Sequence, residues 1–210
     1  MSRYALLCGL LLLLVPIHSD AQSFRAWGVK AGLTSAGQGY DYSQYDNSSD
    51  RRLGFCVAFY VEWFDGAPFS ISTELGYTQR GTTETFDVFP VDLDAMGPTT
   101  ISNRLDYLSL PILAALRVEA PTVSPFVEFG PRVDLLLGYS HGVDNFDPVF
   151  GRSKAVALGA TVGIGLTHKT LFSRPVRIEA RYNWDLNKSY STEFLEVSNN
   201  AVDILVGMES

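Results

Sequence analysis

Apolar and polar side chains alternate along eight separate segments of the chain. The clearest segment runs from Leu53 to Trp63, where every second residue is a large apolar or aromatic one. Alternation with a period of two predicts β-strands that have one apolar face and one polar face. The eight predicted strands cover residues 24–33, 53–64, 69–80, 105–118, 122–139, 155–166, 176–185 and 201–208.

The joints between these strands alternate in length. Long polar joints span residues 34–52, 86–104, 140–154 and 187–200, and short joints span 65–68, 119–123 and 167–174. When antiparallel strands cross a membrane, successive joints lie on opposite sides, so one side carries tight turns and the other carries long loops. The pattern therefore predicts an all-β chain that forms an eight-stranded antiparallel up-and-down transmembrane β-barrel with four long external loops.

Two segments need a closer reading. Residues 155–166 carry no charge and could be read as a helix, but Gly159, Gly163 and Gly165 weaken a helix and the run is too short to span a membrane as one. We predict a strand there. Pro111 lies inside the fourth strand and has no N–H to donate to a neighbouring strand, so we expect a bulge or a local bend at that residue.

The polar face of the strands combines glycines with charges of both signs. A soluble lipocalin-like barrel would show the same alternation with its apolar face inside. Glycine weakens a strand that faces water, whereas in a narrow barrel small residues leave room for long charged side chains. We therefore place the polar face in the lumen and expect paired ions and a filled interior. The glycines are Gly28, Gly32, Gly54, Gly76, Gly130 and Gly138; the cations are Lys30, Arg80, Arg117, Arg132, Arg177 and Arg181; the carboxylates are Glu62, Glu74, Asp106, Glu128, Asp134, Glu179 and Asp185.

Aromatic residues recur on the apolar face, near the ends of the strands. Trp and Tyr side chains prefer the interface between lipid and water, so a membrane barrel carries aromatic girdles. Aromatic residues also favour strands in general, which is the alternative explanation. The predicted girdle residues are Trp27, Trp63, Phe69, Tyr77, Phe129, Tyr139, Tyr182 and Trp184.

The first 21 residues read as a secretory signal peptide. Arg3 precedes an apolar run from Ala5 to Val15, and small residues follow near Ala21. A membrane anchor is the competing interpretation, but a spanning helix needs about 20 apolar residues. We predict a signal peptide over residues 1–21 and an outer-membrane β-barrel domain over residues 22–210, exported to the cell outer membrane of a Gram-negative bacterium with both termini in the periplasm.

Charge and cysteine content exclude several classes of protein. The formal net charge is −7 and basic residues do not cluster, which argues against a nucleic-acid partner. Of the two cysteines, Cys8 lies in the predicted signal peptide, so Cys56 alone remains and cannot form an internal disulfide.

Few residues suggest catalysis or metal binding. His141 lies near Ser140, Asp144 and Asp147 in a long joint, a set that could hold a base, a nucleophile and a carboxylate, but proximity in sequence does not make a triad. We expect His168 in a short turn, remote from that set. The acidic residues Asp41, Asp46, Asp50, Asp92 and Asp94 could offer oxygen ligands to calcium, yet no EF-hand spacing is present. We predict no catalytic, cofactor-binding or metal site.

Four short strings resemble a known family, the outer-membrane β-barrel proteins that include PorT-like members. They are Trp27–Leu33, Leu105–Ile112, Pro125–Pro131 and Ile178–Trp184, and their order covers nearly all of the predicted mature chain. The resemblance implies an eight-stranded barrel in the outer membrane and says little about activity, although some members are linked to protein secretion. It also implies a terminal aromatic residue read by the assembly machinery, whereas this chain ends Met208-Glu209-Ser210.

The sequence thus predicts a non-enzymatic barrel with a structural, adhesive or secretion-accessory role. Its expected partners are outer-membrane lipid, the barrel assembly machinery and an unidentified external or periplasmic protein. The alternatives are a barrel enzyme that acts on lipid or peptide at the outer rim, and a soluble lipocalin-like carrier.

Overall fold

The computed structural model describes residues 24–42, 45–48, 50–64, 68–86, 99–140, 155–171, 174–187, 190–191 and 195–210. The predicted signal peptide lies outside the described residues and stays a prediction. Within the described ranges, no helix has the length and apolar character needed to cross a membrane.

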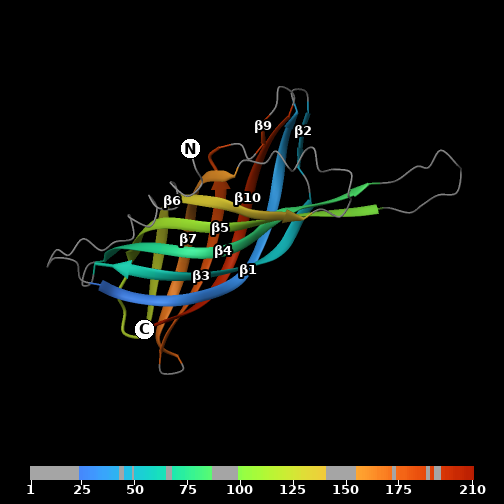
Figure 1. Ribbon diagram of the computed structural model, residues 1–210. Helices are drawn as coiled ribbons and strands as arrows, with labels where there is room; N and C mark the ends of the chain where they lie inside the picture. Colours follow the sequence, from blue (N-terminus) through green and yellow to red (C-terminus); the bar gives the residue numbers. More distant parts are fainter. Residues whose placement is uncertain are drawn as a thin grey trace, which may run out of the picture.

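Eight long strands form one closed antiparallel sheet (Figure 1). The last long strand, β10, pairs with the first, β1, from Gly28↔Glu209 to Tyr42↔Leu195, so the barrel has no open edge along its wall. Closure matters because an unpaired backbone group in hydrocarbon costs several kcal/mol, on the order of a lost hydrogen bond or more. The long strands are β1 (Phe24–Tyr42), β3 (Asp50–Trp63), β4 (Phe69–Phe86), β5 (Thr99–Arg117), β6 (Val123–Ser140), β7 (Val156–Leu171), β8 (Arg174–Asp185) and β10 (Leu195–Glu209). The eight-stranded antiparallel barrel is confirmed.

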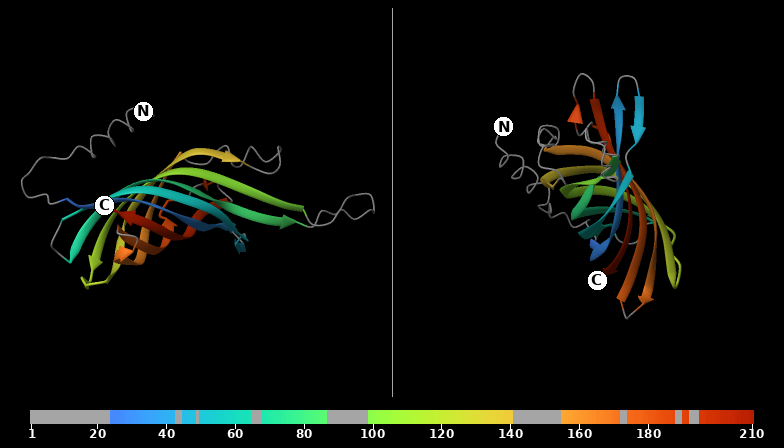
Figure 2. Two further views of the ribbon diagram at one scale, coloured as in Figure 1. Left: turned by 90° about the horizontal axis from the view of Figure 1, so that it is seen from below. Right: turned by 90° about the vertical axis from the view of Figure 1, so that its right-hand side faces the viewer.

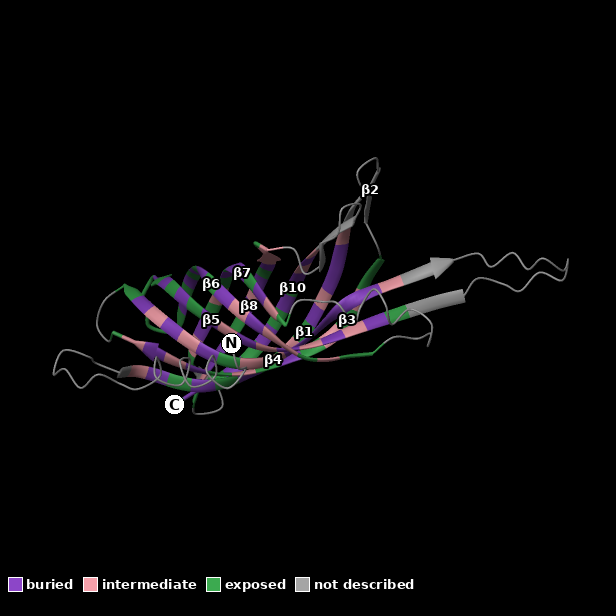
Figure 3. Ribbon diagram, turned by 45° about the horizontal axis from the view of Figure 1, so that its top comes forward, coloured by how far each residue is buried: buried purple, intermediate pink, exposed green. Residues whose placement is uncertain are grey.

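Burial alternates along every long strand (Figure 3). Large apolar side chains point outward and are exposed, for example Val57 at 45% and Phe129 at 58%, while charged side chains such as Arg177 at 1% and Glu128 at 2% point into the barrel. A soluble carrier would show the opposite arrangement. The predicted orientation of the two faces is confirmed. The predicted girdle residues lie on the outward-facing side except for Tyr139, which pairs with the buried Leu105 on the lumen-facing side.

The strands are longer than predicted at one end of the barrel. Residues 34–52, predicted to be a loop, instead continue β1 to Tyr42, include the short strand β2 (Tyr45–Ser48) and begin β3 at Asp50. Likewise β5 begins at Thr99. The short strand β9 (Tyr190–Ser191) pairs with the first residues of β10, in the part of β10 that projects from the barrel wall. The sequence prediction failed here because apolar alternation stops where the strands leave the apolar layer, although their backbone pairing continues.

Two ribbons therefore project from this end in different directions (Figures 1 and 2). The β4–β5 arm contains residues 82–86 and 99–103, and the β1–β10 arm contains residues 35–42 and 195–200 together with β2 and β9. The other end carries the two described chain ends, Phe24 and Ser210, and the short turns. We call these the arm end and the terminal end.

Two local expectations were wrong, and a third was confirmed. Pro111 pairs with Arg132 without any change of register, and the irregularity of the β5–β6 ladder lies between Asp106 and Tyr107. His168 lies within β7, where it pairs with Val123 and Val176, because that strand extends beyond the predicted boundary at residue 166. The strand prediction for residues 155–166 is confirmed by β7.

Residues 208–210 continue β10 along β1 at the terminal end. Met208 faces outward and is 44% exposed, Glu209 faces the lumen at 6% exposure, and the Ser210 N–H donates to the carbonyl oxygen of Trp27 at 2.9 Å. The alternation of outward and lumen-facing side chains along β10 therefore extends to Glu209.

Candidate functional site

The lumen holds the densest set of buried charged groups in the described chain. Alternation along the strands sends one charged side chain after another inward, and two clusters result. The terminal-end cluster contains Lys30, Glu62, Glu74, Arg117, Glu128, Arg177, Glu179, Arg181 and Glu209; the arm-end cluster contains Arg80, Arg132, Asp134, Asp185 and Asp203.

Glu74 joins two cations in the terminal-end cluster. Arg181 Nη1 and Nη2 donate to its two carboxylate oxygens at 2.8 and 2.7 Å, and Lys30 Nζ donates to Oε1 at 2.8 Å. Lys30 also reaches Glu179 Oε2 at 3.0 Å. A buried charge is costly unless it is paired and hydrogen-bonded, and this geometry satisfies the condition for each of these groups.

Arg177 is the centre of the same cluster. It forms ion pairs with four carboxylates from three other strands and its own: Glu62 at 3.5 Å, Glu128 at 3.1 Å, Glu209 at 3.5 Å and Glu179 on β8. Its guanidinium lies 4.0 Å from the ring centroid of Phe126. Cation–π contact of this kind adds stabilisation where the charge is desolvated.

The arm-end cluster is smaller and brings together side chains from four strands, β4, β6, β8 and β10. Arg132 donates from Nε to Asp134 Oδ2 and from Nη2 to Asp185 Oδ1, both at 2.7 Å, and Arg80 Nη1 lies 2.7 Å from Asp134 Oδ2. Next to them, Asn183 Nδ2 donates to Asp203 Oδ2 at 2.7 Å.

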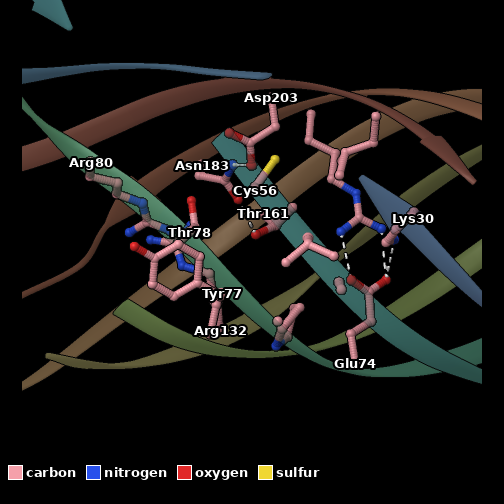
Figure 4. A pocket seen from close by; sticks show the side chains of 17 residues that line it. Lys30, Cys56, Glu74, Tyr77, Thr78, Arg80, Arg132, Thr161, Asn183 and Asp203 are labelled. Atoms are coloured by element: carbon pink, nitrogen blue, oxygen red, sulfur yellow. Dashed lines mark hydrogen bonds and ion pairs between the residues drawn. The ribbon is translucent and has the colours of Figure 1, made fainter. Parts of the chain in front are cut away.

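A cavity of about 40 Å³ lies between the two clusters (Figure 4). Lys30 and Glu74 line one side, Arg80 lines the other, and Cys56 and Asp203 lie between them. One water molecule needs a cavity volume on the order of 10–15 Å³, so this cavity has room for a few water molecules and not for a larger solute. The lumen is filled by its own side chains, as the sequence predicted.

Glycines make room for these side chains at specific points. A Cβ on Gly163 would lie 2.7 Å from Glu128 Oε1 and 3.0 Å from Arg181 Cγ, so any larger residue there displaces the ion pairs. This close approach confirms the prediction that glycines in the lumen leave room for long charged side chains. Gly138 is the exception: the irregularity of the β5–β6 ladder brings it opposite Asp106 on the outward face, so its predicted place in the lumen was wrong, and a Cβ there meets no atom within 4 Å.

This difference yields a matched test. We expect Gly163→Val to destabilise the barrel by about 1–3 kcal/mol, the usual effect of overpacking, because Glu128 and Arg181 must both move. The measurement is urea unfolding of the refolded barrel in detergent, followed by tryptophan fluorescence. Gly138→Val is the control and should unfold at the wild-type urea concentration; equal destabilisation by both substitutions would contradict the packing described.

Most of the predicted lumen charges are where the sequence placed them, with one correction. Asp106 faces outward with Leu108, accepts a hydrogen bond from Tyr77 Oη at 2.8 Å and lies 3.2 Å from Arg104. Asp106 is two residues from the outward-facing Leu108, and this spacing in the sequence could have shown that Asp106 faces outward. The sequence reading missed two lumen carboxylates, Asp203 and Glu209, although alternation with the outward Val202 and Met208 marks both.

Most of the candidate catalytic and calcium-binding side chains lie outside the part of the chain that the structure describes. His141, Asp144, Asp147, Asp92 and Asp94 lie outside the described residues, as do the side chains of Asp41 and Asp46. Ser140 is exposed at the end of β6, and Asp50 is exposed at the start of β3. Among the described side chains, no group of three or more His, Cys, Asp or Glu residues is arranged to hold a metal ion.

Comparison with solved structures returns other membrane barrels. Ail, the attachment invasion locus protein of Yersinia pestis, is 15% identical over 90% of this chain and 100% of its own, with a TM-score of 0.45. OprG from Pseudomonas aeruginosa is 9% identical over 89% and 96%, with a TM-score of 0.49. The outer membrane enzyme PagL is 13% identical over 83% and 97%, with a TM-score of 0.41. None of these similarities assigns an activity to this chain.

The family comparison is more direct. No curated protein matches the chain. A family model described as the outer membrane protein beta-barrel domain matches residues 20–191, which include most of the barrel wall and both ion clusters except for the residues of β10. The chain therefore belongs to the outer membrane protein beta-barrel domain family and is a protein of the bacterial outer membrane.

Proposed function

We propose that this barrel is a non-enzymatic scaffold that presents its two arms outside the cell, in an adhesive, structural or secretion-accessory role. The observation that carries the proposal is the contrast between the two parts of the molecule. Buried ion pairs fill the lumen around a cavity of about 40 Å³, whereas the strands continue well beyond the apolar layer.

The length of the β4–β5 arm supports an external role. The outward apolar residues of β4 end at Tyr77, and the strand continues for residues 78–86, which is about 30 Å along the strand at ~3.3 Å per residue. A hydrocarbon layer needs only about 9–11 tilted residues per strand. Paired backbone of this length is stiff enough to hold a binding surface away from the membrane.

The remaining parts of the proposal concern export and assembly. Residues 1–21 act as the cleaved signal peptide, the terminal end faces the periplasm, and the barrel assembly machinery inserts the chain. The lipid surroundings supply the partner for the outward apolar face. The PorT-like resemblance supports the secretion-accessory form of the role.

Shortening one arm tests this function. In a strain that lacks the gene, we expect the wild-type protein to restore surface adhesion or secretion, and a variant with residues 84–101 replaced by Asn-Gly to restore neither. Heat-modifiable migration in a denaturing gel shows whether the shortened barrel folds and is the control. Full restoration of both phenotypes by the folded, shortened barrel would refute a role for this arm.

An enzyme acting at the outer rim is the competing function. It predicts hydrolysis of a lipid or peptide substrate by the purified barrel and loss of that activity on His141→Ala. Our proposal predicts that His141→Ala leaves adhesion and secretion unchanged, so the same complementation assay separates the two.

A further inference from the structure

Three arginines gather at the arm end, where the outward apolar face stops. On β3 the apolar positions end at Leu53, which is 73% exposed, and Arg52 and Arg51 follow toward the arms. On β5 the outward side chains change from Leu108 to Asp106 and Arg104 at the same boundary. We call Arg51, Arg52 and Arg104 the arginine patch.

Two of these guanidinium groups have only neutral partners. Arg52 Nε donates to Ser102 Oγ at 3.3 Å, and its Nη1 has no hydrogen-bond partner. Arg51 donates from Nε to Ser35 Oγ at 3.0 Å and from Nη1 to Asn200 Oδ1 at 2.8 Å. Neither makes an ion pair with a described carboxylate.

The third arginine adds to the excess of positive charge. Arg104 Nε lies 3.2 Å from Asp106 Oδ2, but this carboxylate also accepts the Tyr77 hydroxyl at 2.8 Å. The charge of Arg104 acts against that of Arg52 and is offset only in part by Asp106. The other described carboxylate near the patch, Asp50, is exposed. Three cations thus face two carboxylates in a protein whose net charge is −7.

A glycine lies on the strand between Arg52 and Arg104. Strand β4 lies between β3 and β5, and at this level it carries Gly81, which pairs with Arg104 and precedes Thr82, the partner of Arg51. Gly81 has a φ of 136°, and a Cβ there would lie 1.9 Å from the Asn103 carbonyl oxygen. Position 81 therefore excludes a larger residue, and no side chain from it lies beside the two arginines.

From this geometry we infer that the arginine patch binds the phosphorylated headgroup of an outer-leaflet lipid. Guanidinium groups recognise phosphate oxygens through paired, charge-assisted hydrogen bonds. The patch faces outward directly above apolar side chains, so a lipid can place its phosphate at the arginines and its acyl chains against Leu53 and Phe55. A soluble anion would gain nothing from that apolar surface, which is why a lipid is the occupant that fits.

The inference rests on the proposed orientation, with the arm end outside the cell. That orientation is read separately, from protease cleavage of a tag placed between Phe86 and Thr99 in intact cells. A tag that resists the protease in intact cells would refute the orientation. The binding experiment below uses the purified barrel and therefore tests the site itself.

The test is lipid retention by the purified barrel, measured by native mass spectrometry. The probes are a bisphosphorylated lipid A and its phosphate-free analogue, supplied in neutral detergent. We expect the wild-type barrel to retain the phosphorylated lipid about tenfold better than the analogue, and Arg52→Gln or Arg104→Gln to reduce this preference about tenfold, the effect of losing one charge-assisted contact. Arg174→Gln, at an exposed position of the terminal end, is the matched control and should bind as wild type does.

Several outcomes would overturn the site. Equal retention of the two lipids, or an equal loss for Arg174→Gln, would show that the arginine patch has no special role. Competition by inorganic phosphate at the concentration of the lipid would assign the site to free phosphate instead. Heat-modifiable migration confirms folding, and if Arg52→Gln does not fold, Arg104→Gln and Arg51→Gln carry the comparison.

Discussion

Arginine in place of Val57 should prevent most of the protein from reaching a folded state in the membrane. Val57 lies midway along the outward apolar residues of β3 and is 45% exposed to the surroundings of the barrel. An arginine on the lipid face near the middle of a bilayer costs about 2–4 kcal/mol, because its charge leaves water without gaining a partner. We expect the folded fraction in lipid vesicles, measured by heat-modifiable migration, to fall sharply.

The control is the same substitution outside the apolar layer. Val118 follows the end of β5 at the terminal end and is 64% exposed, so Val118→Arg adds the same charge where water is available. We expect wild-type folding from it. On the lumen side, Ala58→Ser should also fold normally, since the polar face accepts a hydroxyl. Equal yields of Val57→Arg and Val118→Arg would mean that hydrocarbon does not touch this face.

Removal of the Arg177 guanidinium should be the most damaging change inside the lumen. Four carboxylates surround this side chain, which is 1% exposed. Arg177→Met keeps much of the volume but leaves Glu62, Glu128 and Glu179 close together without their shared cation. Loss of one member of a buried ion network costs about 3–5 kcal/mol. The measurement is the urea midpoint of unfolding in detergent micelles.

Two further variants separate charge from packing. Arg174→Met changes the same residue type on the same strand at an exposed position and should leave the midpoint unchanged. Adding Glu179→Gln to Arg177→Met removes one negative charge from a cluster that then holds more carboxylates than cations, and should recover part of the loss. If the double variant is no more stable than Arg177→Met alone, repulsion among the carboxylates is not the cause.

The arms show a limit of pattern reading. Residues 34–52 contain few large apolar side chains, so period-two alternation could not mark them as strand. Pairing of Gly37 with Asn200 and of Tyr40 with Asn47 nevertheless continues the sheet there. Backbone hydrogen bonds between strands do not require an apolar face, so the pattern of apolar residues does not reveal them.

Asp106 shows a second limit. Its charge suggested the lumen, while its place two residues from Leu108 indicated the outward face, and the structure follows the alternation. An aspartate is tolerated on the outward face because it lies at the edge of the apolar layer, next to Arg104 and the Tyr77 hydroxyl. The position of Asp106 along the strand determines which face its side chain lies on. Whether that position lies inside or at the edge of the apolar layer depends on the assembled barrel.

The sequence by itself determined the strand number, the antiparallel order, the lumen-facing charges and the outward apolar face, because a period of two links each residue to one side of a sheet. Only the tertiary structure decided which charges meet. Arg177 finds Glu62 and Glu128 from strands far away in sequence, and Arg52 finds Ser102 across an intervening strand. These contacts depend on barrel closure and on strand register, and register is fixed by pairing between distant segments, which no local pattern encodes.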